Sequence, residues 1–141
     1  MARIKTGRLI LGGIVAGILV NVSETILNTV VLKRPWEDAM RAMGKPMVMT
    51  STAMMVWIAW GFVYGILCVW VYAGIRPRFG PGPATAARAG FVAWLLAGLL
   101  PSVAMANMGI APASLLTTSA IWTLVESIVV TIVGAALYRE E

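Results

Sequence analysis

Two glutamates lie inside segments that are otherwise apolar enough to cross a membrane. Glu24 interrupts the apolar run 9–32, and Glu126 lies near the middle of the run 112–138. An ionisable side chain at that depth costs about 3 kcal/mol on insertion scales, so it is by default a candidate functional residue. Two carboxyls in a medium of low dielectric constant cannot both ionise cheaply, so at least one should hold a proton at neutral pH. The pair therefore predicts a site for a proton, or for a cation that displaces it.

Each glutamate shares a helical face with other polar residues. At about 100° per residue, one face of the first run carries Gly13, Gly17, Asn21, Glu24 and Asn28. The corresponding face of the last run carries mainly hydroxyl groups. If these two helices are neighbours, both carboxyls can lie in one pocket with a hydrogen-bonding shell of Asn21, Asn28, Thr123 and Ser127. The alternative is that these groups only join helices by hydrogen bonds worth about 0.6–2 kcal/mol each.

Aromatic residues in the second apolar run form a possible wall for that pocket. Trp57, Trp60 and Tyr64 share one face, where they could either line a pocket or pack in the core. Gly13 and Gly17, like Gly61 and Gly65, have the spacing that lets two helix backbones approach closely. In the third run, Ala89, Ala93 and Ala97 form a packing seam, either within the bundle or between protomers.

A helix needs about 20 apolar residues to cross a membrane. The chain has four apolar runs of at least about that length, and they carry the faces described above. They cover residues 9–32, 48–75, 84–105 and 112–138, and they predict one all-α domain over residues 1–141. A short interfacial helix is expected at 35–43, with a proline at its start and a glycine just past its end. The segment 76–83 should be a rigid turn that no helix enters, and Pro101 should kink or end the third helix.

The composition excludes several classes of protein. Hydrophobic residues make up 60% of the 141 residues and charged residues only 12%, half the usual fraction for a soluble domain. The chain has no histidine and one cysteine, so imidazole ligation, Ser-His or Cys-His catalysis and an internal disulfide are all excluded. We expect no enzyme activity, no cofactor, no metal site and no binding to nucleic acid.

The basic residues predict the orientation in the membrane. The larger group flanks the two termini and the second connection: Arg3, Lys5, Arg8, Arg76, Arg78, Arg88 and Arg139. The first connection has fewer, and two acidic residues offset them. Positive flanks remain in the cytoplasm, so we expect both termini there, in a bacterial inner membrane. The N-terminal charges also fit a signal peptide, but no small-residue cleavage site follows, which favours a retained first helix.

Parts of the sequence resemble two families of small membrane proteins. The run 23–33, with Glu24 and a lysine at the helix end, resembles the first helix of small multidrug resistance transporters, which are also four-helix proteins. The chain as a whole is similar to a family of uncharacterised small bacterial four-helix membrane proteins. The shared features are an Asn/Glu first helix, a Gly-Pro-Gly-Pro turn and a terminal Tyr-Arg-Glu, and this second resemblance implies no activity.

The sequence therefore favours a small transporter or conduit coupled to protons or cations, embedded in a lipid bilayer. Glu24 and Glu126 would be its titrating pair. Small-residue seams suggest a homo-oligomer or a subunit of a membrane complex. The alternative is a non-catalytic accessory or scaffold subunit, or one that binds lipid or pigment, in a larger membrane assembly.

Overall fold

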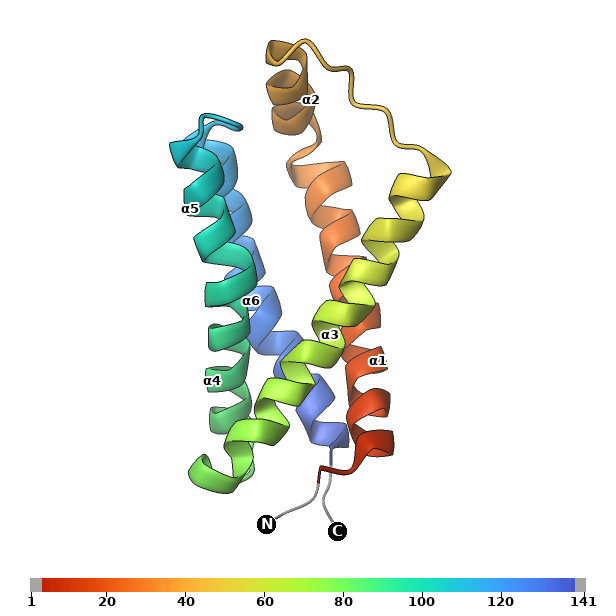
Figure 1. Cartoon of the computed structure of the whole chain (residues 1–141), viewed down its shortest axis with the longest axis vertical. Helices are drawn as coiled ribbons and strands as arrows, with labels where there is room; N and C mark the ends of the chain where they lie inside the picture. The colour runs from red at the N-terminus through yellow and green to blue at the C-terminus, as the bar shows by residue number, and fades with distance from the viewer. Residues whose placement is uncertain (1–3, 139–141) are drawn as a thin grey trace.

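The computed structural model describes residues 4–138 and shows an all-α bundle (Figure 1). In chain order, its elements are α1 (Thr6–Ile26), the π-helical segment η1 (Leu27–Val31), α2 (Lys33–Ala42), α3 (Ser51–Phe79), α4 (Pro83–Trp94), the π-helical segment η2 (Leu95–Leu99), α5 (Leu100–Asn107) and α6 (Ala113–Leu137). The predicted fold class is confirmed, because four long apolar helices are present with one short helix between the first two.

Four helical stretches are long and apolar enough to cross a membrane. They are Thr6–Val31, Ser51–Phe79, Pro83–Asn107 and Ala113–Leu137, with 26, 29, 25 and 25 residues. At a rise of 1.5 Å per residue, even the shortest spans about 38 Å, more than the ~30 Å of a hydrocarbon core. The chain is therefore built as a small membrane protein with four spans.

The bundle has two distinct ends (Figure 1). The start of α1, the connection between α3 and α4, and the end of α6 lie together at one end, which we call the turn end. The short helix α2 lies at the other end, which we call the α2 end. Ala39 of α2 packs there in an apolar cluster with Ala111, Leu115 and Leu116, so α2 is docked on the start of α6.

The prediction that no helix enters residues 76–83 was wrong. Helix α3 continues through Pro77 as far as Phe79, because a proline in the last turn removes a single backbone hydrogen bond. The N–H of Gly80 then donates to the carbonyl of Arg76 over 2.8 Å and closes the helix. Gly80 and Gly82 have φ angles of +81° and +130°, which side chains rarely tolerate, and α4 begins at Pro83.

Pro101 does not end the third span. Helix α5 starts at Leu100 and carries the span on to Asn107. The π-helical turn η2 lies directly before the proline, so the helix widens where the proline ring would otherwise meet the preceding turn. Figure 1 shows α4 and α5 following one another as a single rod.

The predicted glycine motifs of the first two spans pack against each other. A Cβ added at Gly65 would collide with the backbone of Gly17 and lie 2.7 Å from the carbonyl oxygen of Gly13. A Cβ at Gly17 would lie 2.8 Å from the Cα of Phe62. The backbones of α1 and α3 therefore cross in direct contact, which only glycine allows.

Helix α6 closes the bundle against α1 and α4 in the same way. A Cβ at Gly134 would lie 2.8 Å from the carbonyl oxygen of Gly12, and a Cβ at Gly90 would lie 2.5 Å from that of Ser127. Ala89 and Ala93 are buried, as the predicted seam requires, whereas Ala97 is exposed. Of the predicted seam, Ala89 and Ala93 therefore pack within the bundle.

Burial divides the bundle into two halves. The buried residues of α1 end at Val20 and those of α3 begin at Gly61, while η1 keeps only Leu27 buried and η2 and α5 have no buried residue. We call the half toward the turn end the packed half and the half toward α2 the open half. Glu126 lies where the two halves meet.

Candidate functional site

Glu126 is buried where α6 meets α1 and α3. Its side chain is only 7% exposed. Ser23 of α1 lies within hydrogen-bonding reach of the carboxyl, and Tyr64 and Cys68 of α3 are near enough to interact with it electrostatically. Among residues 4–138, the buried oxygen Oε2 of Glu126 has no hydrogen-bond partner. A buried acceptor without a partner costs about 1–3 kcal/mol.

Ser23 is held in place by a tryptophan from the other helix. The indole Nε1 of Trp122 lies 2.9 Å from the Ser23 hydroxyl oxygen. An indole N–H can only donate, so Ser23 accepts this bond and keeps its own hydrogen for the carboxyl of Glu126. The contact joins α1 to α6 and places a donor beside the acid.

Glu24 differs from the prediction of two buried carboxyls. Only Glu126 is buried, while Glu24 is half-buried in the open half. Its Oε2 accepts a hydrogen bond from Nδ2 of Asn28 over 2.8 Å, and the same amide also bonds to the Glu24 carbonyl. Glu24 is more exposed than predicted because it lies in an exposed part of α1, where its neighbours Thr25 and Ile26 are also exposed. The two acids still lie close enough to interact electrostatically.

A second polar chain runs from α3 into α6. The hydroxyl groups of Tyr64 and Ser127 lie 2.7 Å apart, and that of Ser127 also donates to the carbonyl of Thr123 over 2.6 Å. Since serine has one hydroxyl hydrogen, Tyr64 is the donor to Ser127. Ser127, Cys68 and Thr131 are completely buried, so this polar chain is sealed inside the packed half.

Three of the four predicted shell residues bond elsewhere. The amide of Asn21 donates to the carbonyls of Gly17 and Ile58, at 2.9 and 3.2 Å, and so joins α1 to α3. The hydroxyl of Thr123 donates to the carbonyl of Ser119 within its own helix. Only Asn28 bonds to a glutamate side chain, and Ser127 accepts a hydrogen bond from Tyr64 instead.

Of the three residues predicted to form an aromatic wall, only Tyr64 reaches the polar residues between the helices. Trp57 and Trp60 are 62% and 58% exposed, on the outside of the open half, and do not cover the carboxyls. Tyr64 is half-buried and reaches Ser127. The difference arises because α3 joins the packed helices only from Gly61 onward.

Sequence reasoning missed Ser23, Trp122 and Cys68 as neighbours of the buried acid. Trp122 precedes Glu126 by four residues, so helical spacing alone places the two on one face. Ser23 precedes Glu24 directly, and nothing local indicates that it faces the other helix. Its partner in α6 is 99 residues away in the sequence.

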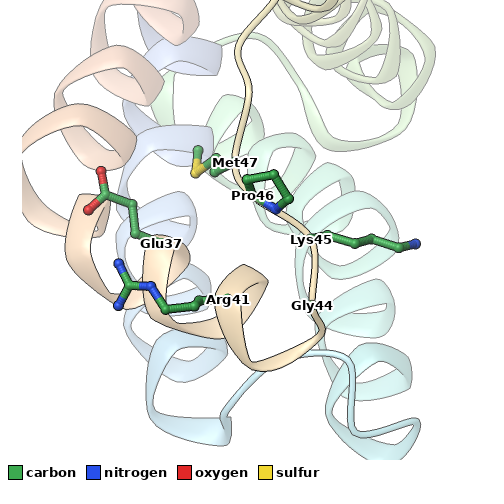
Figure 2. Close-up of a pocket in the computed structure, with 6 residues that line it drawn as sticks. All are labelled: Glu37, Arg41, Gly44, Lys45, Pro46 and Met47. Atoms are coloured by element: carbon green, nitrogen blue, oxygen red, sulfur yellow. The ribbon is translucent and has the colours of Figure 1, made fainter.

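A hollow lies away from the two glutamates, at the α2 end. It has a volume of about 470 Å³ and is lined by α2 and the following segment: Glu37, Arg41, Gly44, Lys45, Pro46 and Met47. Figure 2 shows Glu37 and Arg41 on one side and Lys45 pointing away from both. Arg41 is also paired with Asp38 at 3.0 Å. The charged groups do not converge, so this hollow offers no built binding site.

Comparison with known proteins gives no relative. No family model matches the chain, and neither a curated protein nor a solved structure matches it. The class of protein is therefore defined by the fold and the site alone. It is a small membrane protein with four apolar spans and, among residues 4–138, one buried glutamate at their junction.

Proposed function

We propose that this protein is a small transporter or conduit that carries a proton or cation on Glu126. The observation that supports it is the buried carboxyl with one unpartnered oxygen, at the junction of three apolar helices. Such a group is costly in a membrane, and it is the kind of residue that ion and proton pathways use. Glu24 is the second acidic group on the same pathway.

The orientation is part of the same proposal. The basic residues of α1, α4 and the end of α3 gather at the turn end, and this favours a cytoplasmic location for that end. The α2 end would then face outward from a bacterial inner membrane, with the lipid bilayer around the spans.

Flux through purified protein tests this function. The full chain is reconstituted into vesicles with a pH-sensitive dye inside, and an electrical potential is imposed across the membrane. Dye response should be large for the wild type and absent for Glu126→Gln, with Glu24→Gln also strongly reduced. Glu37→Gln is the matched control, because Glu37 lies on α2 away from the site. Unchanged flux in Glu126→Gln, with the same elution volume and helix content as wild type, would reject the proposal.

A second candidate function rests on the open half. Every residue of 51–60 except Ala53 is exposed, although the carbonyl of Ile58 accepts a hydrogen bond from Asn21 of α1. A stretch of a membrane span with exposed side chains has room for a partner protein, which favours an accessory or scaffold subunit of a larger assembly. Extraction in a gentle detergent distinguishes the two candidates. Co-purification with fixed partner proteins supports the subunit role, and a free monomer or homo-oligomer with flux contradicts it.

A further inference from the structure

We propose that Arg78 and Arg88 bind the phosphate group of an anionic phospholipid, beside the turn that joins α3 to α4. This inference goes beyond the proposed function, because it concerns the lipid around the bundle and does not involve Glu126. It rests on the positions of the two arginines, on the aromatic ring beside them and on a helix start that no side chain caps.

Arg88 lies inside the third span, although it carries a charge. It follows Pro83, where α4 begins, by five positions, which is about 8 Å along the helix at 1.5 Å per residue. The span exceeds a hydrocarbon core of ~30 Å by only about 4 Å at each end, so the Cα of Arg88 lies within the hydrocarbon. A long basic side chain at that depth extends to the headgroups. The helix directs it there, because side chains lean toward the N-terminus of a helix and α4 starts at the turn end (Figure 1).

The guanidinium of Arg88 is held against the end of α3. It lies over the ring of Phe79, 5.2 Å from the ring centroid, and Phe79 is itself 50% exposed. A guanidinium stacked on a ring keeps its N–H donors at the edge of the stack, where they can reach another partner. Arg78 directly precedes this ring and is exposed as well. Neither arginine has a salt bridge within residues 4–138, so both keep donors for an anion.

The turn beside these arginines is held by hydrogen bonds from both sides. The N–H of Gly82 donates to the Tyr72 hydroxyl over 3.2 Å, and the Thr85 hydroxyl donates to the carbonyl of Phe79 over 3.3 Å. These two bonds attach the start of α4 to the end of α3. The aromatic ring and the start of α4 therefore keep fixed positions, so little conformational entropy is lost when an anion binds there.

The start of α4 adds hydrogen-bond donors at the same place. Its N-cap residue is Gly82, no side chain of the described residues caps it, and its first turn holds no acidic residue. The first backbone N–H groups of a helix lack partners within the helix and attract anions. A phosphate at this point can meet these N–H groups and the arginines together, which neither feature provides alone.

Helix dipoles explain one arginine but not the other. A cation in the last turn of a helix is stabilised by the C-terminal carbonyl groups, and this accounts for Arg78 in α3. Arg88 lies near the start of α4, which is the positive end of that dipole. A bound anion at the turn balances both the second arginine and the helix start.

The anion available at this depth is a lipid phosphate, which guanidinium groups bind through two parallel hydrogen bonds. Among the described residues, the turn end carries basic side chains and no acidic one, which favours a lipid of net negative charge. The α2 end differs, because Glu37 and Asp38 lie among its basic residues and Arg41 is paired with Asp38 at 3.0 Å. The charge pattern therefore favours the turn end for an anionic lipid.

Lipid titration tests the site. The full chain in neutral detergent is titrated with phosphatidylglycerol or phosphatidylcholine, and native mass spectrometry counts the bound lipids. We expect phosphatidylglycerol to bind more tightly, and Arg78→Gln and Arg88→Gln each to weaken its binding about fivefold, the effect of one basic residue near a charged membrane surface. Arg34→Gln is the matched control, because Arg34 is exposed on α2 at the other end. Equal affinity for the two lipids, no loss in the two variants, or the same loss in Arg34→Gln overturns the proposal.

Two further measurements identify the occupant. Inorganic phosphate in excess should leave the affinity for phosphatidylglycerol unchanged, and displacement of the lipid would overturn its assignment in favour of free phosphate. Glu140 and Glu141 lie outside the described residues, and a variant with both Glu140→Gln and Glu141→Gln should bind phosphatidylglycerol as the wild type does. A gain in affinity would show that the chain's own C-terminal carboxylates occupy the site, which also overturns the proposal.

Discussion

The two halves of the bundle are built from different residues. In the packed half, the contacts between α1, α3 and α6 are made by glycines such as Gly12, Gly65 and Gly134, so backbones touch. In the open half, α3 has large side chains, including Trp57 and Trp60, and these are exposed. The comparison shows that close packing in this protein follows the small residues rather than the hydrophobic ones, because lipid solvates large apolar side chains as well as a neighbouring helix does.

The strongest test adds a methyl group at two glycines of α3, one in close contact with α1 and one in open space. Gly65→Ala should lower the free energy of unfolding by about 1–3 kcal/mol, since the new Cβ collides with the backbone of Gly17. Gly74→Ala is the matched control, because nothing lies within 4 Å of its added Cβ. Thermal or denaturant unfolding in detergent measures both. Equal stability of the two variants would show that the backbone contact is not tight.

A buried hydrogen bond between α4 and α6 should have the next largest effect. Trp94 donates from Nε1 to the carbonyl of Ala120 over 2.8 Å. Trp94→Phe removes this bond and should cost about 1 kcal/mol in the same unfolding experiment. Trp70→Phe, on an exposed tryptophan of α3, should change stability by less than about 0.5 kcal/mol. A Trp94 variant as stable as the Trp70 variant would contradict this difference.

The boundary between the halves should show a smaller, specific coupling. Trp122→Phe and Ser23→Ala each remove one partner of the same hydrogen bond. A double-mutant cycle of unfolding free energies should give a coupling of about 0.6 kcal/mol, the average for such contacts between membrane helices. Purely additive effects would mean that this bond does not form.

The open half should respond least. Trp57→Ala and Trp60→Ala should each change the unfolding free energy by less than about 0.5 kcal/mol, because more than half of each side chain is exposed. The purified protein in detergent is the sample to measure. A loss as large as that of Trp94→Phe would indicate that another chain packs on this stretch, and would favour the subunit role.

Much of the fold could be predicted because its signals are local. The length of each apolar run indicates a span, and the helix α2 at Lys33–Ala42 lies close to the predicted 35–43. The turn at 76–83 was mispredicted because a proline near the end of a helix costs little, and only the following glycines reverse the chain.

The site was harder to predict than the fold. Spacing correctly placed Asn28 beside Glu24, since residues four apart on a helix are neighbours. It also placed Asn21 beside Glu24, but in the structure the Asn21 amide donates a hydrogen bond to the carbonyl of Ile58 on α3. An amide can bond to either carboxyl or backbone, and the choice depends on which helix crosses nearby.

The sequence by itself determined four apolar spans, the depth of Glu24 and Glu126, and the glycine motifs able to form a close crossing. These properties depend on run length and helical period, which are set by neighbours within a few turns. Tertiary structure decided that one acid is buried while the other is half-exposed, and that Ser23 and Trp122 meet beside it. The reason is that the angle at which α1 leaves α3 and α6 fixes both exposures, and that angle is set by contacts between residues far apart in the chain.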